Sequence, residues 1–424
     1  MTHTESDTPA AAPPGHISPQ PEAQRRILRV LFLSQILSGA GLAAGITVGG
    51  LLAEQMLGST GLAGLPSALF TAGSALAAVL VGRISQARGR RPGLAAGYLA
   101  GAVGAAGVIA ATVVDSPVLL FAALFVYGSG TATNLQARYA GADLAAPACR
   151  ARAVSSVLVA TTLGGVLGPN LAAPTGDLAT ALGIPALAGP FLLAGAAYAL
   201  AALVLALRLR PDPLLLARQL DAAQAATAPS PTTPEETGKR RPGVVLGALV
   251  MILTQLVMVA IMTMTPVHMA AHGHGTAASG LVIGIHVGAM YLPSPLTGRL
   301  VDRYGRLPVA AASGLTLLAA GILAATAPAG SVALLALALA LLGIGWNLGL
   351  VSGTAIITDS VPLATRAKTQ GLVDVSIAIA GATGGLASGL VVAATGYAFL
   401  SLTGGILALA ILPAIAATAA AKPR

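Results

Sequence analysis

Methionine and histidine side chains are concentrated in one segment of the sequence. Six of the eight methionines and four of the six histidines fall between residues 251 and 290. Met258 and Met262 are four residues apart, as are His286 and Met290, so each pair shares one face of a helix. Thioether and imidazole groups together prefer a soft metal ion such as Cu(I), whereas Mg²⁺ and Ca²⁺ prefer oxygen ligands. These four residues therefore predict a transient copper path.

More histidines lie between the two pairs. The segment His268-Met269-Ala-Ala-His272-Gly-His274 would form the short outer connection between two helices and pass metal toward the pairs. Packing is the alternative role, because methionine fills irregular gaps in apolar cores. His286 favours a function, because an ionisable side chain in the middle of an apolar run is costly in a bilayer.

Two other charged residues lie near or within apolar runs. Asp374 could carry a coupling proton, or it could form an ion pair with Arg366 or another nearby arginine. Arg138, at the end of an earlier run, has the same two interpretations. The remaining polar candidates are Gln370, Trp346 and Asn347.

The composition excludes several classes of protein. Only 9% of the 424 residues are charged and 55% are hydrophobic, whereas soluble domains carry roughly a quarter charged residues. A soluble enzyme is therefore excluded, and so is a disulfide-rich secreted module, because Cys149 is the only cysteine. The net charge of +9 does not indicate nucleic-acid binding, because the charges lie between long apolar runs. We predict an integral membrane protein.

Twelve apolar runs are long enough to cross a bilayer as helices, which takes about 20 residues each. The predicted spans are 28–53, 61–82, 94–114, 118–138, 153–173, 187–207, 244–267, 276–297, 309–327, 331–353, 369–393 and 397–417. The predicted division is a disordered tail over 1–27, a bundle over 28–208, a flexible cytoplasmic linker over 209–243, a bundle over 244–417 and a tail over 418–424.

The distribution of charge between the runs predicts the orientation. With the N-terminus inside, all 23 basic residues fall in cytoplasmic segments, whereas the outer loops hold the acids Glu54, Asp115 and Asp177. Lysine and arginine accumulate on the cytoplasmic side of membrane proteins. Both termini are therefore predicted to be cytoplasmic.

A loop pattern recurs at one fixed offset of 216 residues. Gly82, Gly89 and Arg90 in the first copy correspond to Gly298, Gly305 and Arg306 in the second. A common offset indicates a duplicated six-helix unit, as in many secondary transporters. The predicted gating residues are Gly82, Arg83, Gly89, Arg90, Gly298, Asp302, Arg303, Gly305 and Arg306.

The G-x-L-x-D-R-x-G-R pattern at 298–306 resembles the loop signature of the major facilitator superfamily. The resemblance implies an all-α membrane protein with twelve transmembrane helices in two pseudo-symmetric six-helix bundles that work by alternating access. Gln86 stands where the first copy of the signature usually has aspartate. We therefore expect the contact made by the first loop to be weaker than that made by the second.

Two interpretations of the cargo remain open. Met258-x-x-x-Met262 followed by His286-x-x-x-Met290 resembles the paired motifs of the CcoA-type copper importers of that superfamily, some of whose relatives carry solutes such as riboflavin. The segment with Gly165, Gly168 and Pro169 is instead similar to a motif of proton-coupled drug antiporters, and this similarity favours a small organic solute as cargo. Alternatively, the same residues form a glycine-proline kink that serves helix packing.

No phosphate-binding loop of the G-x-x-x-x-G-K-[ST] type is present, so we expect no direct use of ATP. The sequence predicts no enzyme chemistry, no cofactor and no nucleic-acid partner. The expected partners are the lipid bilayer and a transported solute or metal ion, and the expected protein is a monomer in a bacterial plasma membrane.

Overall fold

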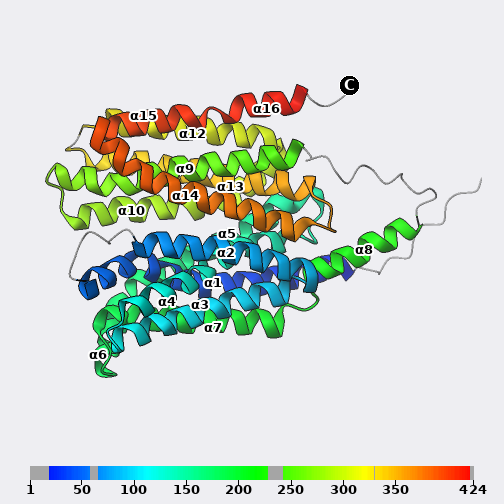
Figure 1. The fold of residues 1–424 in the computed structure, drawn as a ribbon. Helices are drawn as coiled ribbons and strands as arrows, with labels where there is room; N and C mark the ends of the chain where they lie inside the picture. The colour runs from blue at the N-terminus through cyan, green and yellow to red at the C-terminus, as the bar shows by residue number, and fades with distance from the viewer. Residues whose placement is uncertain (1–18, 58–64, 228–241, 329, 421–424) are drawn as a thin grey trace, which may run out of the picture.

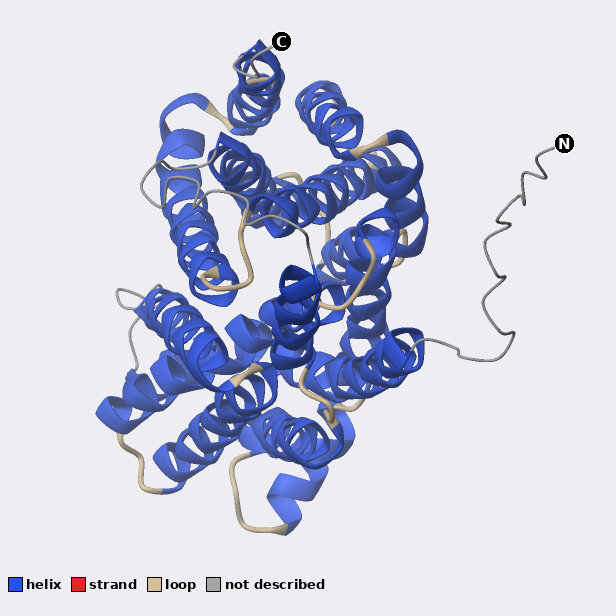
Figure 2. Ribbon diagram, turned by 90° about the vertical axis from the view of Figure 1, so that its right-hand side faces the viewer, coloured by secondary structure: helices blue, strands red, loops and turns tan. Residues whose placement is uncertain are grey.

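The computed structural model describes residues 19–57, 65–227, 242–328 and 330–420. These residues form helices joined by turns and short loops, and no strand occurs among them (Figure 2). Residues 1–18, 228–241 and 421–424, which include most of the predicted tails and part of the predicted linker, lie outside the described residues.

The long helices pack as two groups, which Figure 1 shows as two halves of the molecule. The N-terminal bundle contains α1 (Pro19–Leu57), α2 (Leu65–Arg88), α3 (Arg90–Val113), α4 (Pro117–Ala142), α5 (Arg150–Asn170) and α7 (Gly189–Arg208), with the short α6 (Ala172–Ala181) between the last two. The C-terminal bundle contains α9 (Pro242–Ala271), α10 (Thr276–Tyr291), α11 (Ser294–Tyr304), α12 (Arg306–Thr326), α13 (Val332–Ser360), α14 (Arg366–Thr395), α15 (Tyr397–Ala408) and α16 (Ile411–Ala420).

Each of the twelve predicted spans corresponds to one helix or one pair of helices in line. Ten of the described helical stretches are long and apolar enough to cross a membrane. Helices α1 and α5 are not among these ten, but they pack against each other within the N-terminal bundle. The eighth span is broken between α10 and α11 at Pro293, because proline has no N–H to continue the helical hydrogen bonds.

Two boundaries differ from the prediction. Helix α1 begins at Pro19, inside the predicted tail, and α8 (Pro213–Thr227) is a regular helix inside the predicted flexible linker. The side chain of Asp212 accepts hydrogen bonds from the N–H groups of Leu214 and Leu215, at 3.0 and 3.2 Å, which caps α8. Leu214 is fully buried, so capping and burial together order the start of the linker.

The core of the N-terminal bundle is an aromatic cluster. The rings of Tyr98, Tyr127, Tyr198 and Phe191 are buried, and those of Tyr127 and Phe191 meet edge to face at 5.3 Å. Such edge-to-face pairs are favourable beyond the area that they bury. The core of the C-terminal bundle is built instead from leucine, valine and methionine around Trp346.

The two bundles meet where helices α2 and α14, and α11 and α5, cross at small residues. A Cβ atom on Gly82 would lie 2.9 Å from the carbonyl oxygen of Ala367 and 3.1 Å from the Cα of Gly371. A Cβ atom on Gly298 would lie 2.8 Å from the carbonyl oxygen of Ala151. Glycine therefore permits backbone-to-backbone contact at both crossings. Both lie toward the end of the molecule that carries the α2–α3, α4–α5, α11–α12 and α13–α14 loops, here called the basic end.

Candidate gate and transport site

A buried cluster of charges joins the bundles at the basic end. Asp143, after the end of α4, lies 2.8 Å from the Nε of Arg90 and 3.8 Å from the Nη1 of Arg366. Arg90 also donates a hydrogen bond of 2.5 Å to the side-chain oxygen of Gln370. Arg90 and Asp143 belong to the first bundle, and Arg366 and Gln370 to the second. Since Arg90 and Asp143 are fully buried, each depends on the other for charge compensation.

A second cluster stands at the positions 216 residues away. Asp359 forms ion pairs with Arg306, at 2.5 Å, and with Arg150 of the other bundle. Its side chain is 27% exposed, and those of Arg150 and Arg306 are 18% and 28% exposed. Both clusters therefore place one aspartate between two arginines from different bundles, but only the first includes a glutamine, Gln370, and only the first is removed from solvent.

Asp302 fixes the start of a helix in the opposite bundle. Its two carboxylate oxygens accept hydrogen bonds of 3.1 Å from the N–H groups of Ala151 and Arg152, in the first turn of α5. The Nε of Arg152 also lies 3.1 Å from this carboxylate. A negative charge at a helix N-terminus is favourable, because the unpaired N–H groups carry partial positive charge.

Gln86 makes the matching contact in the first copy. Its side-chain oxygen accepts from the N–H groups of Ala367 and Lys368, in the first turn of α14, at 2.9 and 3.3 Å. Its side-chain nitrogen donates to the carbonyl oxygens of Ala364, at 2.6 Å, and Leu363, at 3.4 Å. The contact that we expected to be weaker lacks a charge, but it has two hydrogen bonds that a carboxylate could not make.

The other predicted gating residues have separate roles. Gly89 and Gly305 have φ angles of 99° and 97°, in the region that favours glycine, and each ends one helix and precedes the next. Arg303 extends over the ring of Tyr304, with 5.2 Å from its guanidinium carbon to the ring centroid. Arg83 is exposed, and no ion pair to it is found among the described residues.

A buried ion pair lies deeper, between α4 and α14. The Nη2 of Arg138 is 2.7 Å from a carboxylate oxygen of Asp374, which also accepts a hydrogen bond of 3.2 Å from Tyr139. Arg138 donates to the hydroxyl of Thr354 at 3.1 Å, and these two residues are themselves 216 positions apart. Asp374 therefore pairs with Arg138 of the other bundle and not with Arg366, and this pair lies close to the pseudo-symmetry axis.

Aromatic and amide side chains lie near this pair in the C-terminal bundle. The indole N–H of Trp346 donates to the side-chain oxygen of Gln255 at 2.8 Å. The ring of Tyr291 meets that of Trp346 edge to face, with 5.6 Å between centroids, and lies within electrostatic range of Arg138. Gln255 and Tyr291 are half-buried. Trp346 is itself buried in the core, so Tyr291 and Gln255 supply the more accessible aromatic ring and amide of this group, near the charge of Arg138.

Comparisons with known proteins identify the family. The family model of the Major Facilitator Superfamily matches residues 31–293 and 248–424. The MFS-type transporter YdeG of Bacillus subtilis (strain 168) is 57% identical over 414 residues, which are 96% of each chain. This chain belongs to the major facilitator superfamily. It is therefore a multi-pass membrane carrier of small solutes and not an enzyme.

Two further proteins are similar to this superfamily member. The riboflavin transporter RfnT of Brucella anthropi is 32% identical over 362 residues, which cover 83% of this chain and 85% of that protein. The structure of the proton:xylose symporter XylE matches with a TM-score of 0.74 at 17% identity, covering 95% of this chain and 97% of that one. The second likeness is one of fold alone.

The gate of this facilitator-family protein is closed at the basic end. The hydrogen bonds and ion pairs found between the described parts of the two bundles extend from the loops of that end to Arg138 and Asp374. Asp374 is eight residues from the start of α14, a depth of about 12 Å along the helix. The conformation therefore blocks passage from the basic end to the centre.

The methionine and histidine pairs lie in the core of the C-terminal bundle. Met258 and Met290 are buried in it, and Met262 packs against it. His286 is fully buried, and its Nδ1 makes a hydrogen bond of 2.8 Å to the carbonyl oxygen of Leu339 in α13. Helix α10 packs mainly on α13, whereas α9 packs on both α14 and α13, and α9 and α10 touch each other little.

The predicted outer histidines form a stack at the opposite end. The ring of His268 lies 4.4 Å from those of Tyr397 and His272, and is nearly parallel to that of Tyr397. Met269 is fully buried and His274 half-buried. No group of three or more His, Cys, Asp or Glu side chains able to hold a metal ion occurs within the described ranges.

The antiporter-like segment has one tight contact. A Cβ atom on Gly164 would lie 2.1 Å from the carbonyl oxygen of Ile36, so α1 and α5 touch there. A Cβ atom on Gly165 would meet nothing within 4 Å. Gly168 is buried, and the side chain of Pro169 lies outside the described residues. Helix packing therefore accounts for Gly164, whereas Gly165 faces open space.

The N-terminal bundle also holds a buried polar network that the sequence patterns did not predict. The hydroxyl of Tyr98 donates to the side-chain oxygen of Gln35 at 2.6 Å. The amide nitrogen of Gln35 donates to the hydroxyl of Thr161, and that of Asn134 to the hydroxyl of Ser38. Uncharged polar residues such as Gln35 and Asn134 inside apolar runs were the available signal.

Proposed function

We propose that this protein is a secondary transporter of a small organic solute with a flat, hydrogen-bonding ring system, moved by alternating access. The supporting observation is the contact of the buried Trp346 with the half-buried Tyr291 and Gln255, of which Tyr291 lies within electrostatic range of Arg138. The similarity to a riboflavin transporter over most of the chain favours the same class of solute. Aromatic faces bind flat rings by stacking, and the amide and guanidinium groups supply hydrogen bonds.

Riboflavin uptake into proteoliposomes tests this proposal. We expect the wild type to accumulate riboflavin and Trp346→Leu to lose most of that uptake, while Trp346→Phe keeps a larger share. Leu407→Ala serves as a matched control, because Leu407 is 43% exposed on α15 and lies outside the proposed site. Equal uptake by Trp346→Leu and the control would contradict a role of this group, and no uptake by the wild type would exclude this solute.

The Arg138–Asp374 pair is the proposed coupling element. A proton on Asp374 would remove one charge of a pair that links the bundles, and so would ease their separation. We expect Asp374→Asn to abolish uphill accumulation driven by a pH gradient while solute exchange persists. A purely structural ion pair would instead be needed for both activities, and the two assays together separate these roles.

Copper import is the second candidate. The Nε2 of His286 is buried and has no hydrogen-bond partner among the described residues, and Met290 lies one turn further along α10. A buried nitrogen without a partner is costly, and binding a soft metal ion would satisfy it. We expect Met262→Leu and His286→Leu to abolish cellular copper uptake if copper is the cargo, whereas Met251→Leu, nearer the basic end, keeps it. Wild-type copper levels in both variants would leave the methionines as packing residues.

The proposed orientation puts both termini and the basic end in the cytoplasm of a bacterial cell, in the plasma membrane. The support is that the loops holding lysine and arginine alternate with loops holding none, whereas Arg138 lies inside α4. Cysteines introduced in a Cys149→Ser background test it: an external thiol reagent should label position 272 and not position 230. The reverse pattern would invert the orientation. We also propose a monomer, which the mass of the purified protein in detergent will check.

A further inference from the structure

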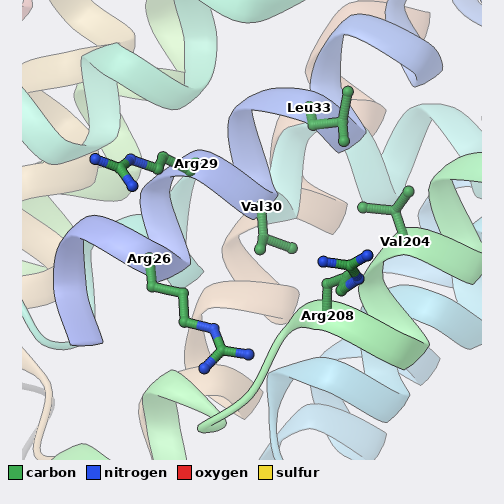
Figure 3. A pocket seen from close by; sticks show the side chains of 6 residues that line it. All are labelled: Arg26, Arg29, Val30, Leu33, Val204 and Arg208. Carbon is green, nitrogen blue, oxygen red and sulfur yellow. The ribbon is translucent and has the colours of Figure 1, made fainter. Parts of the chain in front are cut away.

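A hollow of about 410 Å³ lies at the basic end, between the first turns of α1 and the last turn of α7. It is lined by Arg26, Arg29, Val30, Leu33, Val204 and Arg208 (Figure 3). None of these residues belongs to the gate or to the proposed solute site. Its volume falls within the range of roughly 300–1,000 Å³ that small-ligand sites occupy.

The hollow has positive charge, and within the described ranges no acid forms an ion pair with its arginines. Figure 3 shows Arg26 and Arg208 extending into the space between the two helices, whereas the guanidinium group of Arg29 points away from it. Glu22 is one turn from Arg26 on α1, but the structure shows no ion pair between them. In contrast, the arginines of both gate clusters are paired with aspartate. The guanidinium groups of the hollow are therefore available to an anion.

The wall below the arginines is apolar and continues toward the lipid. Leu33 is seven residues beyond Arg26, or about 10 Å along α1, and 48% exposed. On α7, Leu203 and Leu207 are 52% and 58% exposed. Exposed leucines on a membrane-spanning helix face acyl chains. The hollow therefore presents a charged rim at the level of the headgroups and an apolar groove below it.

We propose that this hollow binds one anionic phospholipid from the leaflet at the basic end. The phosphodiester lies between Arg26 and Arg208, and an acyl chain follows Val30, Leu33 and Val204. Basic pockets between helices at the cytoplasmic side are suited to anionic headgroups. A zwitterionic lipid binds less well, because its own cation meets two unpaired guanidinium groups. The lipid joins the first and the last long helix of the N-terminal bundle.

Native mass spectrometry of the full chain in detergent tests the proposal, with dioleoyl-phosphatidylglycerol and dioleoyl-phosphatidylcholine as probes. We expect one molecule of phosphatidylglycerol to bind more tightly than the rest and phosphatidylcholine to show no such site. Each guanidinium near the headgroup is worth about fivefold in affinity. The Arg26→Gln/Arg208→Gln variant should therefore bind the first phosphatidylglycerol about 25-fold more weakly.

The control variant, Arg25→Gln/Arg210→Gln, removes two exposed arginines nearby and should keep the tight site. Equal losses in both variants would show attraction to surface charge alone and overturn the proposal, as would no loss in either. Val204→Trp should fill the groove and weaken lipid binding although all charges are retained. Unchanged binding in this variant would show that charge alone holds the lipid and would overturn the proposal. Inorganic phosphate at the same concentration should not displace the lipid, and displacement would favour a free-anion site.

Discussion

At the scale of single residues, burial separates the two gate clusters. Asp143 is fully buried beside Arg90, whereas Asp359 is 27% exposed beside Arg306. Breaking a buried pair by removing one partner costs about 3–5 kcal/mol, because it leaves an uncompensated charge. An exposed pair is worth about 1 kcal/mol or less, because water and salt screen it. The aspartate and arginine residues correspond in the two clusters, so the difference in stability comes from burial, which the sequence alone does not show.

We therefore predict that Asp143→Asn destabilises the protein much more than Asp359→Asn. The thermal unfolding midpoint in detergent should fall by several degrees for the first substitution and stay close to wild type for the second. Added salt should reduce the small effect of Asp359→Asn and leave that of Asp143→Asn unchanged. Similar shifts for both variants would mean that the clusters are equally exposed in solution.

At the scale of helices, the duplicated loops use different chemistry for the same contact. Asp302 holds the start of α5 with a charge, and Gln86 holds the start of α14 with a neutral amide. The offset of 216 residues made the correspondence predictable, and it also relates Asp143 to Asp359, which were not among the predicted gating residues. What could not be predicted is that Gln86 faces two carbonyl oxygens as well as two N–H groups.

Introducing a carboxylate at position 86 should therefore weaken the contact between the first loop and the start of α14. In Gln86→Glu a carboxylate oxygen would replace the nitrogen that donates to Ala364, 2.6 Å away, and would repel that carbonyl oxygen. Because this contact is exposed, loss of the hydrogen bond costs only about 1 kcal/mol. We expect the transport rate to fall by at most about fivefold in Gln86→Glu, partly offset by the favourable charge at the start of α14. Faster transport than wild type would show that the charge dominates.

At the scale of the whole molecule, apolar runs predicted the helices and their order. The runs could not predict α8, because its order depends on a cap at Asp212 and on burial of Leu214. They also could not predict the burial of His286 between α10 and α13, because periodicity within one helix does not specify which neighbour that face will meet. Contacts between the bundles were the hardest feature to predict from the sequence, because they exist in only one conformation of the transport cycle.

The glycine crossings should control which conformation is populated. A valine at Gly82 would clash with Gly371 and Ala367 only while the basic end is closed. Overpacking costs about 1–3 kcal/mol, and about 1.4 kcal/mol changes the ratio of two conformations tenfold. We expect Gly82→Val to open the basic end. A cysteine at Val375, which packs between the bundles against Ala78, should then react faster with a hydrophilic thiol reagent in a Cys149→Ser background.

Gly389→Val is the matched control, because a Cβ atom there would meet nothing within 4 Å. The Gly389→Val variant should be labelled at position 375 as fast as the protein without it. This substitution also adds a valine to α14, the helix that carries position 375, but the new side chain meets no clash. Gly298→Val should behave like Gly82→Val, because it blocks the second crossing by contact with Ala151 and Ser155. If both crossing variants leave the labelling rate unchanged, closure of the basic end does not depend on these glycines, and the hydrogen bonds and ion pairs between the bundles must hold it.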